Sequence, residues 1–185
     1  ALWMRVQSGG EAAIGRDEKE DEGAAGGNAL GQAGSAYVYE RTATGGWEEV
    51  QKLVASDRER TGFFGWSVSI SGDYAIVGAM QESEDAAGGN PLSAAGSAYV
   101  YERTATGWEE VQKLVASDRG AFDNFGWSVS ISGDYAIVGA YRESEDAAGG
   151  NPLSAAGSAY VYERTATGWE EVQKLVASDR GTGDQ

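Results

Sequence analysis

The chain has 185 residues, 41% of them apolar, which is a normal content for a globular protein with a hydrophobic core. Its 14 basic and 29 acidic residues give a net charge of −15, which argues against a nucleic-acid partner because phosphate binding needs clustered Lys and Arg. The absence of Cys and His excludes thiol nucleophiles, disulfides, Cys/His zinc sites and Ser-His-Asp triads. No segment approaches the roughly 20 apolar residues that cross a bilayer, and the opening ALWMRV is too short for a signal peptide, so we expect no membrane insertion.

The chain repeats one pattern three times. Segments of sequence WEEVQKLVASDR begin 61 residues apart, at Trp47 (after an extra Gly), Trp108 and Trp169. Residues 64–119 and 125–180 align without a gap and differ at only two positions. We therefore expect a single repeat domain over residues 1–185, in which function depends on how the units are arrayed.

The first unit, residues 3–58, is predicted to be a complete but degraded copy of the second. Its second half matches the second unit closely, whereas its first strand lacks a Phe-Gly pair. In this alignment Val6 takes the place of Val68. We therefore expect a worn first blade.

The second unit, residues 59–119, predicts four antiparallel strands. The apolar runs 66–70 and 74–79 flank Ser-Gly-Asp, which is typical of a tight hairpin. The runs 97–103 and 108–115 flank a Thr-Ala-Thr-Gly turn. The first three strands are apolar on both faces and must be covered on both sides, while the charges of the fourth suit an exposed edge.

The third unit, residues 120–180, repeats this pattern. A four-stranded sheet with a buried inner end and a charged outer edge, repeated in tandem, is typical of a propeller blade. The predicted fold is therefore all-β, a β-propeller of four-stranded antiparallel blades with three blades per chain.

Several short motifs make the pattern more specific. Phe64 and Phe125 are each followed by Gly, and a Gly-Ala pair follows about a dozen residues later. Together with the Ser-Gly-Asp hairpin, the Gly-Ser-Ala-Tyr-Val-Tyr strand and the Gln-Lys-Leu strand, these motifs resemble the FG-GAP repeats of integrin α-subunit propellers and many secreted bacterial proteins. The resemblance covers nearly the whole chain. It implies a β-propeller, a non-enzymatic binding or adhesion role, and a secreted or cell-surface bacterial location.

Two features depart from the family pattern. Met80 and Tyr141 replace the Pro of the GAP element. The integrin calcium loop, Asp-x-Asp-x-Asp-Gly between the first two strands, is replaced by Ser-Gly-Asp. The calcium site that is best known in the family therefore cannot be carried over.

Acidic residues gather in the long loops, which strand alternation places on one face. We predict Glu84, Asp85, Glu145 and Asp146 as candidate ligands of Ca²⁺, which takes six to eight oxygens, and we expect no other cofactor. The spacing matches no defined calcium loop, so solvated loops that keep the protein soluble remain the alternative. Paired carboxylates could also serve glycoside hydrolysis, which needs two of them at about 5–10 Å.

Aromatic residues are predicted to pack between blades. Trp66 and Trp127 follow the Phe-Gly pairs, and with Phe64 and Phe125 we assign them to blade packing. The three tryptophans that open the fourth strands are expected to cover the blade edge. Some propeller lectins bind sugars between blades with such rings, so carbohydrate binding is a second hypothesis.

Three blades are too few for a ring, since propellers typically close with four to eight. We expect the chain to associate with itself, head to tail, and favour a dimer of six blades over a trimer of nine. The alternative to self-association is that the chain is part of a longer natural propeller or an engineered fragment. The near identity of two units fits recent duplication or deliberate construction, and a duplicated or designed unit without an evolved ligand is a further hypothesis. The leading hypothesis is a non-enzymatic FG-GAP-type scaffold or adhesion-like module with a protein or carbohydrate ligand.

Overall fold

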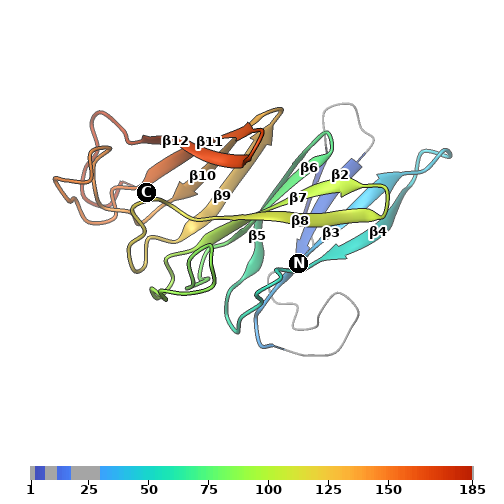
Figure 1. The fold of residues 1–185 in the computed structure, drawn as a ribbon, viewed down its shortest axis with the longest axis horizontal. Helices are drawn as coiled ribbons and strands as arrows, with labels where there is room; N and C mark the ends of the chain where they lie inside the picture. Colours follow the sequence, from blue (N-terminus) through green and yellow to red (C-terminus); the bar gives the residue numbers. More distant parts are fainter. Residues whose placement is uncertain (1–2, 7–11, 18–29, 185) are drawn as a thin grey trace.

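The computed structural model describes residues 3–6, 12–17 and 30–184 and consists of three four-stranded antiparallel sheets (Figure 1). Sheet 1 contains β1 (Trp3–Val6), β2 (Ala12–Asp17), β3 (Ser35–Arg41) and β4 (Trp47–Leu53). Sheet 2 contains β5 (Phe64–Ser71), β6 (Tyr74–Ala79), β7 (Ser97–Thr104) and β8 (Gly107–Leu114). Sheet 3 contains β9 (Phe125–Ser132), β10 (Tyr135–Ala140), β11 (Ser158–Thr165) and β12 (Gly168–Leu175).

Each sheet is a meander in which neighbours along the chain pair with each other. The described residues contain no helix, and hence none long and apolar enough to span a membrane. The predicted all-β class with three four-stranded, blade-like sheets is confirmed, and one sheet lies within each predicted unit.

Turn chemistry explains the inner hairpins. Gly72 (φ 59°) and Gly133 (φ 57°) take the first position of the two-residue turns that join β5 to β6 and β9 to β10. A left-handed residue at this position matches the twist of the flanking strands, and glycine adopts it at no steric cost. The Ser-Gly-Asp segments therefore form tight hairpins, as expected.

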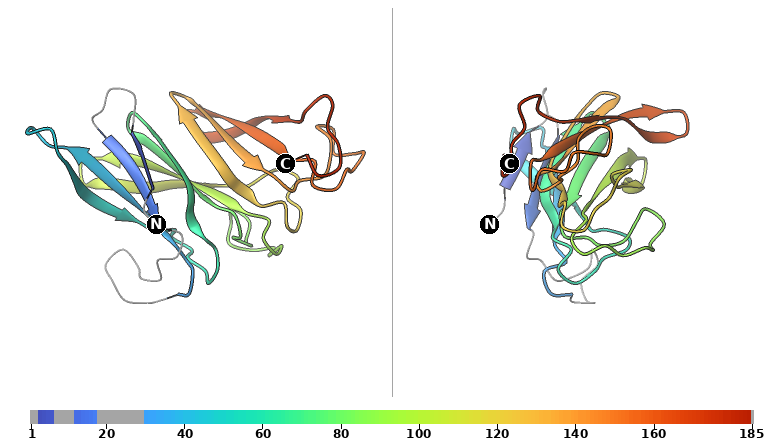
Figure 2. Two further views of the ribbon diagram at one scale, coloured as in Figure 1. Left: turned by 180° about the vertical axis from the view of Figure 1, so that it is seen from behind. Right: turned by 90° about the vertical axis from the view of Figure 1, so that its left-hand side faces the viewer.

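The sheets follow one another in chain order along the long axis of the molecule (Figures 1 and 2). The strand β5 packs against β2 and β3, and β9 packs against β5, β6 and β7. We call the contact between sheets 1 and 2 joint 1–2 and that between sheets 2 and 3 joint 2–3. Since the first strand of each sheet packs on the preceding sheet, the sheets are stacked face to face like neighbouring blades.

Each joint contains one hydrophobic core. In joint 1–2 the buried residues come from both sheets and include Val38 and Leu53 on one side and Phe64 and Val77 on the other. The core of joint 2–3 is built in the same way, from Ile76, Val100, Leu114, Phe125, Val138 and Tyr160. At the two joints, the apolar faces predicted from the strands are therefore covered by the neighbouring sheet.

A bulge at the same place in every outer strand changes which side chains face which joint. In β8 the register shifts at Val111, so that Glu110 pairs with Tyr101 and Gln112 pairs with Val100. Trp108 and Glu110, before the bulge, face joint 1–2, whereas Gln112 and Leu114, after it, face joint 2–3. The outer strand thus contacts both neighbours.

The register of β1 corrects the alignment of the first unit. Val6 pairs with Ala13 in the way that Ile70 pairs with Ala75. Val6 therefore stands in the place of Ile70, and the expected match to Val68 was wrong by two residues. The cause is a longer connection, because five residues separate β1 from β2 where two separate β5 from β6.

The long loop of sheet 2 lies along the connector to sheet 3. Phe122 N donates to Ser93 O at 2.7 Å, and Asn124 N donates to Ala94 O at 3.1 Å. The predicted gathering of these segments on one side of the sheets is confirmed. Both segments contribute side chains to the joints.

Candidate functional site at the blade joints

The phenylalanines of the two Phe-Gly pairs lie at the centre of the joints. Phe125 is buried, and its ring packs edge-on against Tyr160 with 5.5 Å between centroids. Its backbone N donates to Ala95 O of the preceding sheet at 2.9 Å. Phe64 repeats both contacts in joint 1–2. The structure therefore places both phenylalanines where one sheet meets the next.

The glycine of the pair is required by the closeness of the two sheets. Gly126 has φ 86°, and a Cβ atom there would overlap Ser97 O. Its carbonyl oxygen accepts a hydrogen bond of 2.8 Å from Ser67 Oγ. Any larger residue would push the sheets apart or lose this bond. The Phe-Gly pair therefore acts as a docking element between blades.

Trp66 and Trp127 contact each other across joint 2–3. Their ring centroids are 4.8 Å apart, and Trp127 continues the row to Tyr141 at 4.2 Å. Both tryptophans are half-buried. The structure thus places them between blades, beside the Phe-Gly pairs.

One glutamine links neighbouring outer strands through two backbone hydrogen bonds. Gln112 Nε2 donates to Trp169 O at 2.7 Å, and Gln112 Oε1 accepts from Trp169 N at 2.8 Å. Gln51 makes the same pair of bonds with Trp108. Trp108 and Trp169 are 5% and 4% exposed. These two rings are buried in the joints, which corrects the expectation that they cover the outer edge of the blade.

A serine and a glutamate add a second polar link to each joint. Ser117 donates from N and Oγ to the carboxylate of Glu171, at 2.9 and 2.8 Å. Ser56 donates in the same way to Glu110. The joints therefore combine an apolar centre with a polar outer part that fixes how the blades align.

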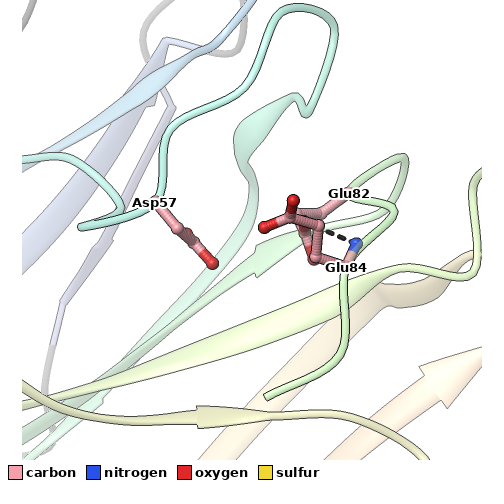
Figure 3. A group of neighbouring side chains, drawn as sticks. All are labelled: Asp57, Glu82 and Glu84. Atoms are coloured by element: carbon pink, nitrogen blue, oxygen red, sulfur yellow. Dashed lines mark hydrogen bonds between the residues drawn. The ribbon is translucent and has the colours of Figure 1, made fainter. Parts of the chain in front are cut away.

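Three carboxylates meet at joint 1–2. Asp57 comes from the connector, and Glu82 and Glu84 come from the long loop of sheet 2 (Figure 3). One oxygen from each lies within 4.8 Å of the others, and Glu84 N donates to Glu82 Oε1 at 2.9 Å. The same arrangement occurs at joint 2–3, with Asp118, Glu143 and Glu145.

A buried lysine ammonium lies among these carboxylates. Lys113 Nζ is 2.7 Å from both Asp57 Oδ2 and Glu82 Oε2, and the side chain is 6% exposed. Tyr99 OH donates to Asp57 Oδ1 at 2.7 Å, and Ser97 Oγ donates to Glu82 Oε2 at 2.6 Å. Burial acts to lower the pKa of Lys113, but the bonds and charges of the two carboxylates outweigh it and raise the pKa. The lysine therefore stays charged.

The carboxylate cluster at joint 2–3 also holds a buried lysine. Lys174 Nζ is 2.6 Å from Asp118 and 3.0 Å from Glu143. Burial acts to raise the pKa of Asp118, but hydrogen bonds from Lys174 and Tyr160 lower it. Among the described residues, no lysine or tyrosine side chain donates a hydrogen bond to Asp123. Its burial, aided by the charges of Glu143 and Asp118, raises its pKa to about 6 despite a hydrogen bond from the backbone of Gly120.

The four predicted calcium ligands separate into two pairs. Glu84 and Glu145 belong to the carboxylate clusters. Asp85 instead accepts bonds within its own loop, from Ala87 N at 2.9 Å, Gly89 N at 3.0 Å and Asn90 Nδ2 at 2.6 Å, and Asp146 does the same in sheet 3. The Asn90 bond and then the backbone bonds lower the pKa of Asp85. Its carboxylate stabilises a loop turn.

The carboxylate clusters are close enough to hold a metal ion, but their fit to Ca²⁺ is poor. Asp57 and Glu82 already bind the Lys113 ammonium. Three carboxylates, two of them committed, fall short of the six to eight oxygens that Ca²⁺ takes. Calcium binding therefore stays a prediction, and the lysine supplies the positive charge in the described structure.

Two segments of the chain, residues 47–101 and 108–162, match the FG-GAP repeat family and together cover more than half of the sequence. The chain belongs to the FG-GAP repeat family. Each matched segment begins at an outer strand and ends in the third strand of the next sheet, so the repeat of the family spans a joint. FG-GAP repeats are typical of extracellular proteins and are generally non-enzymatic. No curated protein matches the chain.

The sequence did not reveal the polar residues that hold the joints. The Gln-Lys-Leu segment served only to recognise the family, yet its Gln and Lys make the contacts described above. The sequence feature that indicates this role of Gln and Lys is the repetition of long polar side chains on a strand that also carries buried residues. Without the bulge, the partner of each side chain could not be assigned.

Proposed function

We propose that this FG-GAP protein is a non-enzymatic scaffold that works by association of blade faces, and that the open face of sheet 3 binds sheet 1 of a second copy. By open face we mean the side of sheet 3 that points away from sheet 2. The observation that carries the proposal is that the two ends of the stack hold opposite halves of one contact.

The open face of sheet 3 holds the donor half. Gln173 and Ser178 are exposed and stand 61 residues after Gln112 and Ser117, which hold the next sheet in joint 2–3. Leu175 is 38% exposed, whereas Leu114, its counterpart in joint 2–3, is 2% exposed. This face therefore has the residues of a joint without a neighbour within the described chain.

Sheet 1 holds the acceptor half. Trp47 stands at the position of Trp108 and Trp169, whose backbones pair with glutamines, and it is more exposed than either. Glu49 is exposed at the position of Glu110 and Glu171, which accept from serines. Bringing the two ends together would pair Gln173 with Trp47 and Ser178 with Glu49.

Two copies joined in this way at both ends give six blades, which lies within the range of four to eight in which propellers typically close. Three copies would give nine. The contact is heterologous, so closure after two copies is what prevents an open filament. Like net charges of −15 on each copy oppose association, and added salt should therefore strengthen it.

A lectin role is less well supported, because the indole rings of Trp108 and Trp169, which would have to stack on sugars, are buried in the joints. We propose a secreted or cell-surface setting, with a cation or a basic protein surface as the type of ligand that suits the acidic field.

Because the chain has no cysteine, a cross-link can test the proposed contact cleanly. The variant Ser178→Cys/Glu49→Cys, treated with a short bismaleimide, should give a covalent dimer on a denaturing gel. The matched control Ser178→Cys/Glu48→Cys moves one thiol to the neighbouring residue, which points to the other face of β4. Equal yields from both variants, or no dimer from the first, would contradict the proposal.

A further inference from the structure

A pocket of about 510 Å³ lies on the open face of sheet 3. Its walls include Gly139, Ala156, Gly157, Leu175 and Ala177. Each of these residues stands 61 positions after a residue that surrounds the Phe-Gly pair in joint 2–3. The pocket therefore has the lining of a Phe-Gly site.

In joint 2–3 the Phe-Gly strand is held by its backbone and by one ring. Phe125 N donates to Ala95 O at 2.9 Å, and the ring lies in the cluster that contains Leu114 and Ala116. Gly126 O accepts from Ser67 Oγ at 2.8 Å. The partners are thus one carbonyl, one hydroxyl and an apolar floor.

A further polar contact fixes the residue before the pair. Asn124 Nδ2 donates to Met80 O at 3.0 Å, and the Asn124 side chain is buried. Because the acceptor is a backbone carbonyl, the change from Met80 to Tyr141 in the third unit leaves it in place. The contact is therefore available to any strand that enters with Asn before Phe-Gly.

Sheet 3 presents the same groups at matching positions. Ser128 and Leu175 are exposed, Ser158 is half-buried, and all three line the pocket. The segment after β12 runs toward the pocket along the same path as the connector before β9. Gly183 N donates to Ser154 O at 2.9 Å, just as Phe122 N donates to Ser93 O in joint 2–3. A strand could therefore enter the pocket in the geometry of β9.

We propose that this pocket binds an extended peptide with a Phe-Gly pair, added to the open face in the way that β9 adds to sheet 2. The ring would enter between Leu175 and Ala177, and the glycine would lie against Ser158 O. This chain's own first unit contains no Phe, so sheet 1 of a second copy cannot supply the ring. The partner is the first strand of an FG-GAP blade that has the dipeptide.

The inference goes beyond the proposed self-association, and the two can be separated. Both occupants cover the same face, so a bound peptide should exclude a second copy. Peptide binding without any dimer would support the pocket and leave self-association unsupported, and a dimer that no peptide displaces would do the reverse.

The test uses the full chain and a fluorescein-labelled peptide of residues 124–132, NFGWSVSIS, followed by fluorescence anisotropy. The peptide begins at Asn124 because the chain's own residues up to Asp184 already follow the path of residues 121–123. Saturable binding is expected. A peptide with Gly126→Ala should bind at least tenfold more weakly, because the added methyl group would overlap a backbone oxygen equivalent to Ser97 O. A peptide with Phe125→Ala should lose affinity to a similar degree.

The protein control is Ala177→Trp, which places a ring in the pocket at an exposed position and should leave folding unchanged. It should weaken binding of the unmodified peptide at least tenfold. Absence of saturable binding, equal affinity of the Gly126→Ala peptide, or full binding by Ala177→Trp would each overturn the inference.

Discussion

The face of sheet 2 that lies in joint 2–3 and the open face of sheet 3 have the same sequence, but only the first is covered by a neighbouring sheet. Ile76 is fully buried in the joint, and Ile137, which stands at the same position on the open face, is 38% exposed. In joint 2–3 Gln112 binds the backbone of Trp169, whereas Gln173, its counterpart on the open face, is exposed. Burial of these side chains therefore depends on the neighbouring blade, since the strands themselves are the same.

The covered joints are more sensitive than the open face, and loss of the buried lysine of joint 1–2 should have the largest effect. Replacing Lys113 by Met leaves the carboxylates of Asp57 and Glu82 facing each other without a positive charge. We expect a loss of about 3 kcal/mol or more in the free energy of unfolding, measured in urea. The double variant Lys113→Met/Glu82→Gln removes one of the two charges and should recover part of the loss. A single variant as stable as the wild type would show that the cluster does not hold the joint.

Truncation of one leucine in each setting compares the two regions directly. Leu114→Ala opens a cavity in the core of joint 2–3 and should cost about 3 kcal/mol. Leu175→Ala changes an exposed position of the same sequence context and should cost less than about 1 kcal/mol in dilute solution. Equal losses in chemical denaturation would mean that the open face is covered at those concentrations.

Removal of the glutamine amide should have a smaller effect of the same kind. Gln112→Ala leaves two backbone groups of Trp169 without their partner and should cost about 1 to 2 kcal/mol. Gln173→Ala should change the stability of the single chain by under about 0.5 kcal/mol. The thermal midpoints of the two variants in dilute solution would settle the difference, and a reversed order would contradict the assignment of the two faces.

The smallest expected effect concerns pH. The pKa of Asp123 is raised to about 6 in the folded protein, against about 4 for an unfolded chain. A raised pKa means that the group favours folding when protonated, so its contribution is complete below about pH 4 and is lost as pH rises through 6. Asp123→Asn should therefore raise stability at pH 7, by up to about 1 kcal/mol after solvent screening, and should not at pH 4.

The control for this experiment is Asp184→Asn, which removes the equivalent carboxylate after sheet 3, outside both joints. Urea midpoints measured at pH 4, 5.5 and 7 give the comparison. A stability difference between wild type and Asp123→Asn that does not vary with pH would contradict the burial of this carboxyl group in joint 2–3.

Repetition made most of the fold predictable from sequence. Because Trp108 and Trp169 open identical segments, one reading of strands and turns served two sheets, and Gly72 and Gly133 marked the hairpins directly. The first sheet was harder, since the longer connection after Val6 shifts the register by two residues without leaving a signal in the apolar pattern.

The candidate site was less predictable because it depends on the bulge at Val111. Trp108, Gln112 and Leu114 share one face of a regular strand, yet the bulge turns Trp108 to one joint and Gln112 and Leu114 to the other. Loop acidity indicated where carboxylates gather, but it could not show that Lys113 from the outer strand lies among them. Both features arise from backbone geometry and from contacts far apart in sequence.

The most direct test of the central claim, that the open face of sheet 3 is an incomplete joint which binds sheet 1 of a second copy, is the mass in solution. Light scattering on a sizing column, at two protein concentrations, should give twice the 19.4 kDa of one chain for the wild type and a lower mass for Gln173→Ala at equal concentration. A single-chain mass at both concentrations, or a dimer that Gln173→Ala leaves intact, would contradict the account.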